Sequence, residues 1–77
     1  MKPTRITNEV KMHRQLASMT QEDLAQRLGV TRQTVIAIEN GKYSPTLETA
    51  FMMASILGVG VEDLFQYPSE EEVGKND

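Results

Sequence analysis

Residues 20–40 read TQEDLAQRLGVTRQTVIAIEN, which predicts two short amphipathic helices joined by a tight turn. Thr20 and Thr31 each precede one helix, in the N-cap position that threonine favours. Gly29 lies between the helices and can adopt the left-handed conformation that ends a helix. Two helices in this arrangement form a helix-turn-helix, whose second helix enters the DNA major groove. The segment therefore predicts DNA binding.

Three further helices are expected around this pair. Residues 8–18 contain no Gly or Pro, and Asn8 offers an N-cap for them. Thr46 opens a longer helix that Gly58 ends, and residues 61–65 form a short last helix. The longer helix carries an apolar stripe made of Leu47, Ala50, Met53, Ala54 and Leu57. These elements predict an all-α protein, a five-helix bundle that contains the helix-turn-helix.

Two segments at the ends of the chain do not fit the helical scheme. Residues 4–7 and 65–67 are rich in β-branched, aromatic and polar side chains, so they could pair as a small antiparallel ribbon. A ribbon this short needs support from packing or from a second subunit. We expect one DNA-binding domain over residues 1–68, followed by an acidic, disordered tail at residues 69–77.

The formal net charge of −3 is unusual for a protein that binds DNA. Residues 69–77 account for all of it, because residues 1–68 contain seven basic and seven acidic side chains. A neutral domain can bind DNA when its cations gather on one face. The acidity therefore argues against strong nonspecific binding and not against specific binding.

The composition argues against several other classes of protein. The chain has no cysteine and His13 is its only histidine, so we expect no disulfide and no metal site. It shows no phosphate-cradling glycine loop and no nucleophile–histidine–carboxylate set, so we expect neither enzymatic activity nor a cofactor. No apolar segment approaches the length needed to span a membrane, which predicts a soluble, cytoplasmic protein.

The second helix of the motif has two distinct sides. At 100° per residue, Val35 and Ile38 mark the buried side, and Arg32 lies at its flank in the first turn. The opposite side carries Gln33, Ile36, Ala37 and Asn40. Arginine can bind O6 and N7 of guanine, glutamine can bind N6 and N7 of adenine, and apolar groups can contact the thymine methyl. For Ile36 the alternative is an ordinary exposed aliphatic side chain.

The start of the motif's first helix predicts a phosphate site, because backbone N–H groups, the helix dipole and the Gln21 amide meet there. Lys42 follows the second helix and is either another phosphate contact or a solvated loop lysine. The complete set of expected DNA-contacting residues is Gln21, Thr31, Arg32, Gln33, Thr34, Ile36, Ala37, Asn40, Lys42 and Tyr43.

Glu39 belongs to the motif but lies next to the buried side of its helix. Arg14 lies in the first predicted helix, so an ion pair between the two would join two helices inside the bundle. We interpret this pair as structural, since removing one partner of a buried pair leaves an uncompensated charge.

The pieces TQxxLAxxLGVTRQTV and ENGKYxP together resemble the helix-turn-helix domain of the Cro/C1-type phage repressors, or xenobiotic-response-element family. The resemblance covers about residues 8–66, and it is close to short members that end in GVxxEDLF. It implies a lambda-repressor-like five-helix bundle, a homodimer and repression at a near-palindromic operator. It also implies that Gln21 lies on a phosphate, that Arg14 pairs with Glu39, and that three residues lie at base edges, namely Arg32, Gln33 and Ala37.

In the closest short members, the resemblance further implies a ribbon at the chain ends that contributes to the dimer interface. We therefore assign Ile6, Leu64, Phe65 and Tyr67 to that interface. The sequence departs from the family pattern at Ser18, which replaces a common Gly before the motif. Ala37 offers only a methyl group where some relatives carry an amide.

A second hypothesis is an antitoxin-like protein that binds a protein partner and uses DNA binding for autoregulation. The acidic tail EEEVGKND would serve this role, because a disordered segment can fold onto a basic partner. The alternative for the tail is a solubilising segment. Double-stranded DNA and a second copy of the chain remain the expected partners.

Overall fold

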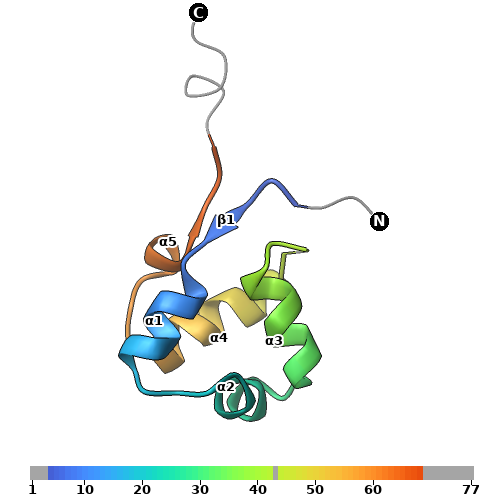
Figure 1. Ribbon diagram of the computed structural model, residues 1–77. Coiled ribbons are helices and arrows are strands. Elements are labelled where there is room, and N and C mark those ends of the chain that lie inside the picture. Colours follow the sequence, from blue (N-terminus) through green and yellow to red (C-terminus); the bar gives the residue numbers. More distant parts are fainter. Residues whose placement is uncertain (1–3, 43, 69–77) are drawn as a thin grey trace, which may run out of the picture.

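The computed structural model describes residues 4–42 and 44–68, which form five helices and one two-stranded ribbon (Figure 1). The helices are α1 (Val10–Leu16), α2 (Gln21–Leu28), α3 (Arg32–Glu39), α4 (Leu47–Leu57) and α5 (Val61–Leu64). The strands are β1 (Thr7–Asn8) and β2 (Phe65–Gln66). The predicted all-α class, the helix-turn-helix and the ribbon are thus confirmed. Tyr43 and the predicted tail at residues 69–77 lie outside the described residues.

Three helices begin at a threonine that caps the first turn with its side chain. The hydroxyls of Thr20, Thr31 and Thr46 accept the backbone N–H three residues on, at 3.0, 3.2 and 3.2 Å. At α2 the cap is reciprocal, because the Asp23 carboxylate accepts the backbone N–H of Thr20 at 2.9 Å. The helix starts predicted at these threonines are confirmed.

The ends of α1, α2, α3 and α4 share one geometry. The residue after each helix or after its cap adopts a left-handed backbone, and the next N–H donates to a carbonyl five residues back. Glycine fills this position at Gly29, Gly41 and Gly58, with φ between 72° and 75°. At the end of α1 the position is filled by Ser18, with φ 59°. Because a side chain disfavours this conformation, Ser18 is strained relative to glycine.

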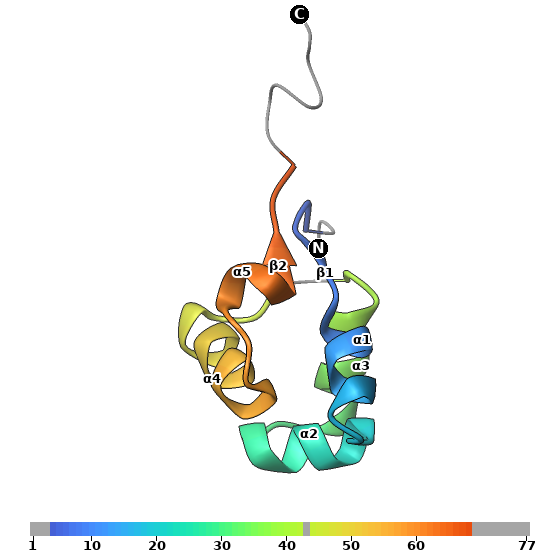
Figure 2. The same cartoon turned by 90° about the vertical axis from the view of Figure 1, so that its left-hand side faces the viewer.

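The core draws a side chain from every helix. Its largest fully buried members are Val10, Leu24, Val35, Ile38, Met53 and Leu64. Figure 2 shows the helices arranged around this shared centre, with α2 at the end of the bundle opposite the ribbon. The core therefore fixes α3 through Val35 and Ile38 and leaves its other side to the surface.

The ribbon pairs Thr7 with Gln66 and Asn8 with Phe65. It begins further along the chain than the predicted segment at residues 4–7, and it takes Asn8 out of the first helix. The helix starts at Val10 instead, although the Asn8 side chain still accepts the Val10 N–H at 3.1 Å. The other end of the Asn8 amide donates to the carbonyl of Ile38 at 2.8 Å, which joins the ribbon to α3.

Two assignments on the apolar surfaces are corrected. Leu47 begins the predicted stripe of α4 but is 74% exposed, so the buried stripe starts at Ala50. Leu64 was expected at a dimer interface, yet it is completely buried in the core of the single chain and cannot contact a second copy. Within the described ranges, no helix has both the length and the apolar character required to cross a membrane.

Candidate nucleic-acid interface

Helix α3 lies along one edge of the bundle (Figure 1). Arg32 and Gln33 in its first turn are exposed, as are Asn40 and Lys42 after its end. Thr31, which caps the helix, is also exposed. The predicted division of this helix into a buried and an outer side is therefore present in the structure.

The middle of α3 differs in part from the prediction. Ile36 and Ala37, expected on the outer face, are partly buried. Thr34 is also partly buried, and its hydroxyl is hydrogen-bonded to that of Thr31 at 3.1 Å. The exposed polar groups are consequently concentrated at the two ends of the helix, and the partly buried apolar side chains of Ile36 and Ala37 lie between them.

The charge on α3 is one-sided. Glu39 is the only acidic residue of the helix, and just 3% of its side chain is exposed. Its carboxylate is withdrawn from the outer surface, whereas the cations of Arg32 and Lys42 remain there. The outer face of α3 therefore lacks negative side chains that would repel a phosphate backbone.

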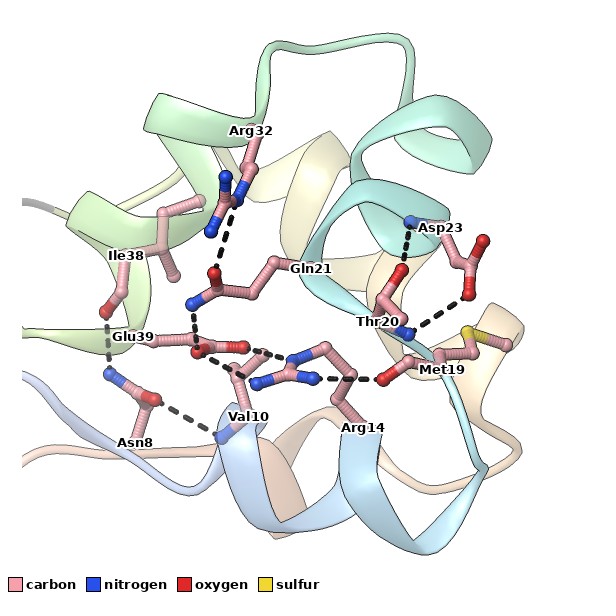
Figure 3. Close-up of polar contacts among 10 residues, drawn as sticks. All are labelled: Asn8, Val10, Arg14, Met19, Thr20, Gln21, Asp23, Arg32, Ile38 and Glu39. Carbon is pink, nitrogen blue, oxygen red and sulfur yellow. Dashed lines mark hydrogen bonds and ion pairs between the residues drawn. The ribbon is translucent and has the colours of Figure 1, made fainter.

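Glu39 is withdrawn because it forms an ion pair with Arg14 inside the bundle (Figure 3). The Arg14 Nε lies 2.6 Å from Oε2 of Glu39, and Nη2 lies 3.3 Å from Oε1. The third nitrogen of the guanidinium, Nη1, donates to the carbonyl of Met19 at 2.8 Å. Arg14 itself is 7% exposed, so this fork holds α1, the turn before α2 and the end of α3 together.

Gln21, the first residue of α2, bridges the ion pair to the surface. Its Nε2 donates to Oε1 of Glu39 at 3.1 Å, and its Oε1 accepts from Nε of Arg32 at 3.4 Å (Figure 3). The sequence prediction placed this side chain on a phosphate and did not foresee either contact. Both contacts join residues far apart in sequence, for which local patterns contain no signal.

The start of α2 combines donors with two carboxylates. A surface depression there is lined by Arg14, Met19, Thr20, Gln21, Glu22 and Arg32. Next to it, the backbone N–H of Thr20 donates to Asp23, and this bond, together with the Thr20 hydroxyl, lowers the pKa of the Asp23 carboxyl below its ordinary value. The depression brings the Arg32 side chain beside the first residues of α2 and the carboxylate of Glu22.

The residues assigned to a dimer interface lie near the ribbon and not at α3. Ile6 and Phe65 line an apolar surface groove with Pro45, Leu47 and Val61. Tyr67 is 63% exposed, and the guanidinium of Arg5 lies 5.7 Å from the centre of its ring. The groove thus includes two of the four predicted residues, joined by α4 and α5 side chains that sequence reasoning did not assign.

A five-helix bundle with a capped helix-turn-helix and an acid-free outer face on its second motif helix defines a DNA-binding regulator of the helix-turn-helix class. Comparison with known proteins places the chain in a family. Residues 10–64 match the family described as "Helix-turn-helix". An HTH-type transcriptional regulator of Methanocaldococcus jannaschii is 55% identical over 64 residues, which cover 83% of this chain and 97% of that protein. The chain therefore belongs to the helix-turn-helix family of transcriptional regulators.

Two further proteins are similar to this chain, one in its solved structure and one in its sequence. The crystal structure of a Bacteroides fragilis protein superposes with a TM-score of 0.74 at 23% identity, covering 79% of this chain and 98% of that one. Antitoxin HipB of Escherichia coli is 34% identical over 55 residues, which cover 71% of this chain and 62% of the antitoxin. The first similarity supports the fold.

Proposed function

We propose that this regulator is a cytoplasmic homodimer that binds a near-palindromic operator through α3 and represses transcription there. The observation that carries the proposal is the one-sided charge of α3. Arg32 and Gln33 on the helix and Lys42 just after its end are exposed, while the only carboxylate of the helix, on Glu39, is buried against Arg14. Such a face matches the donors and acceptors of the major groove.

The base contacts follow from the chemistry of the exposed residues. Arg32 is suited to O6 and N7 of guanine and Gln33 to N6 and N7 of adenine. Ile36 and Ala37 supply the apolar surface between the ends of the helix, which suits a thymine methyl. The remaining expected residues would hold phosphates of the DNA backbone, namely Gln21, Thr31, Thr34, Asn40, Lys42 and Tyr43.

A second copy of the chain is the partner that the apolar groove supports. Leu47 at its rim is 74% exposed, although a large aliphatic side chain gains by leaving water. The groove also borders Ser44 and Pro45, which follow the loop after α3. A dimer formed there would place its two α3 helices at a set separation, as binding to two half-sites requires. Occupation of a promoter by such a dimer would exclude polymerase.

Selection of bound sequences from a random double-stranded DNA library tests this function directly. We expect an inverted repeat whose half-sites are centred about 10 base pairs apart, one turn of B-DNA. Such a site in front of a reporter gene should lower its expression when the protein is present. Failure to enrich any sequence at low or moderate salt would contradict specific DNA binding.

A second candidate function is that of an antitoxin-like protein, which the similarity to antitoxin HipB favours. In that case the chain would bind a protein partner and use its operator for autoregulation. Removal of residues 69–77, which carry a net charge of −3, separates the two functions. If this removal abolishes binding to a purified partner protein and leaves operator binding unchanged, the antitoxin role is supported. Unchanged or slightly tighter operator binding, with no partner affected, would support the repressor alone.

A further inference from the structure

Asn8 in β1 joins three parts of the molecule (Figure 3). Its backbone pairs with Phe65 across the ribbon. Its side-chain Oδ1 accepts the N–H of Val10, the first residue of α1, at 3.1 Å. Its Nδ2 donates to the carbonyl of Ile38, in the last turn of α3, at 2.8 Å. Within the described ranges, this last bond is the only hydrogen bond between the ribbon and α3. One side chain therefore ties the ribbon to α3.

The two ends of the Asn8 amide cannot be exchanged. Val10 presents a backbone N–H, which can only donate, and Ile38 presents a carbonyl, which can only accept. An aspartate at this position would keep the acceptor and lose the donor. The shorter side chain of serine would not replace both atoms of the amide. Asparagine is therefore the residue type that makes both contacts.

The bond from Asn8 is not needed to complete the end of α3. The carbonyl of Ile38 already accepts the backbone N–H of Gly41 at 3.0 Å, and the N–H of Lys42 donates to the carbonyl of Ala37 at 2.9 Å. A backbone carbonyl has two lone pairs, and Asn8 occupies the second one. The bond thus adds a connection to the ribbon and does not satisfy an otherwise unpaired group.

The ribbon end of this connection lies next to the apolar groove. Phe65, which is opposite Asn8, lines the groove together with Ile6, two residues before Asn8. The other end, at Ile38, is two residues before the exposed Asn40. Asn8 is therefore placed between the surface that we assign to a second copy and the helix that we assign to DNA.

We propose that Asn8 is a positioning residue for operator recognition, which fixes α3 relative to the ribbon and so sets the half-site separation that the dimer accepts. This inference rests on the proposed function, in which the groove is the dimer interface. In a two-fold dimer, any change in the angle between ribbon and α3 occurs in both copies. One additional base pair moves a half-site by about 3.4 Å along the duplex and rotates it by about 35°. A fixed α3 therefore discriminates between operators that differ in spacing alone.

The test measures how strongly the full-length chain discriminates between operator spacings. The first duplex is the inverted repeat that the wild-type protein enriches from a random library. Two others have one base pair inserted or removed at its centre. The spacing penalty is the dissociation constant for an altered duplex divided by that for the selected duplex. Because all duplexes meet the same preparation, the folded fraction does not affect this ratio.

Two substitutions remove the donor of Asn8 by different means. Asn8→Asp keeps the acceptor for Val10 and replaces the amide nitrogen by an oxygen, whereas Asn8→Ser keeps a shorter acceptor without a charge. We expect each to lower the spacing penalty about 2- to 10-fold, the effect of one net hydrogen bond. Preference at the base pair read by Gln33 should stay unchanged, since the bonds of Asn8 do not reach the first turn of α3.

Thr7→Val is the matched control in the same strand. Thr7 is exposed, and its hydroxyl donates to the carbonyl of Gln66 at 3.4 Å, within the ribbon. The substitution removes this bond and leaves the contact with α3 in place. We therefore expect Thr7→Val to retain the wild-type spacing penalty.

Hydrogen exchange of the wild-type protein supplies a measurement that needs no substitution. The N–H of Gly41 shares the Ile38 carbonyl with Asn8, and the N–H of Gly29 occupies the same place at the end of α2. Dimer formation at rising protein concentration should slow exchange at Gly41 more than at Gly29.

Several outcomes would overturn the inference and leave the proposed function intact. An unchanged spacing penalty in both Asn8 variants would show that Asn8 only supports the start of α1. An equal fall in Thr7→Val would show a general loosening of the ribbon, and a parallel loss of base preference would show a distorted α3. Equal slowing of exchange at Gly41 and Gly29 would also contradict it. If the random library yields no inverted repeat, the proposed function itself fails.

Discussion

Glu39 lies in α3, the second helix of the motif, yet its carboxylate faces inward and lies 2.6 Å from Nε of Arg14. Both side chains are more than nine-tenths buried, so neither charge has water to compensate for the loss of the other. We expect Glu39→Ala or Arg14→Ala to lower the free energy of unfolding by about 3–5 kcal/mol. The double change Arg14→Met with Glu39→Leu should cost less than either single change. Urea unfolding followed by circular dichroism measures all three, and additive losses would contradict the coupling.

Replacing Ser18 by glycine, the residue found at the equivalent position after α2, α3 and α4, should stabilise the protein. The φ of 59° at Ser18 places a side chain in a conformation that costs an ordinary residue about 1–2 kcal/mol. Ser18→Gly removes that strain, so we expect a gain in unfolding free energy of about 1 kcal/mol, partly offset by the freedom of glycine in the unfolded chain. Ala17→Gly is the matched control, because Ala17 has an ordinary φ of −88° and should be destabilised. A loss in Ser18→Gly as large as that in Ala17→Gly would show that strain plays no part.

Replacing Gln33 or Lys42 by alanine should affect DNA binding in two different ways. Gln33→Ala is expected to cost about 1–3 kcal/mol on the selected operator and to relax preference at one base pair. Lys42→Ala should weaken all sequences alike and reduce the slope of log K against log salt by about 1. Titrations of fluorescent duplexes at several salt concentrations measure both effects. Retained affinity and preference in Gln33→Ala would show that the outer face of α3 is assigned wrongly.

The capping box of α2 predicts sensitivity to acid. The pKa of Asp23 is lowered in the folded state, chiefly because the backbone N–H of Thr20 donates to its carboxylate. The stabilisation is therefore complete above the ordinary aspartate pKa and is lost as pH falls through the lowered value. Asp23→Asn should melt at a lower temperature than wild type at neutral pH, and the difference should shrink in acid. Glu22→Gln removes a neighbouring charge and should not reproduce this change in pH dependence.

If the groove beside the ribbon is the dimer interface, two exposed leucines should respond differently to substitution. Leu47 and Leu16 are each 74% exposed, but only Leu47 lines the groove. We expect Leu47→Lys to shift sedimentation equilibrium from dimer to monomer and to weaken operator binding, because a charge would be buried at the interface. Leu16→Lys, on α1, should leave both properties unchanged. A dimer that tolerates Leu47→Lys must use another surface.

Local signals explain which features of the fold could be predicted. A threonine cap or a terminal glycine acts within one helical turn, and the starts at Thr20, Thr31 and Thr46 all appear in the structure. The incorrect assignments depend on partners distant in sequence. Asn8 favours a cap by itself, but pairing with Phe65 draws its backbone into the ribbon. Leu47 continues an apolar stripe, yet no part of the described chain covers it.

The candidate site follows the same division. The spacing of Val35 and Ile38 was sufficient to orient α3, so the exposure of Arg32 and Gln33 could be expected. Spacing could not show that Gln21 binds Glu39, because residues of α2 and α3 meet only after both helices pack on the core. The hydrogen bond from the Asn8 side-chain amide to the carbonyl of Ile38 was missed for the same reason.

The pairing of Thr7 with Gln66 brings the two ends of the folded unit to within one strand spacing of each other. If two copies pair at the groove beside the ribbon, as proposed, a flexible linker can join the last strand of one copy to the first strand of the other. Such a tandem fusion would make a single polypeptide with two DNA-binding domains, each of which can be mutated independently. It would allow one recognition helix to be altered while the other is kept, so that asymmetric operators could be designed and each half-site measured separately.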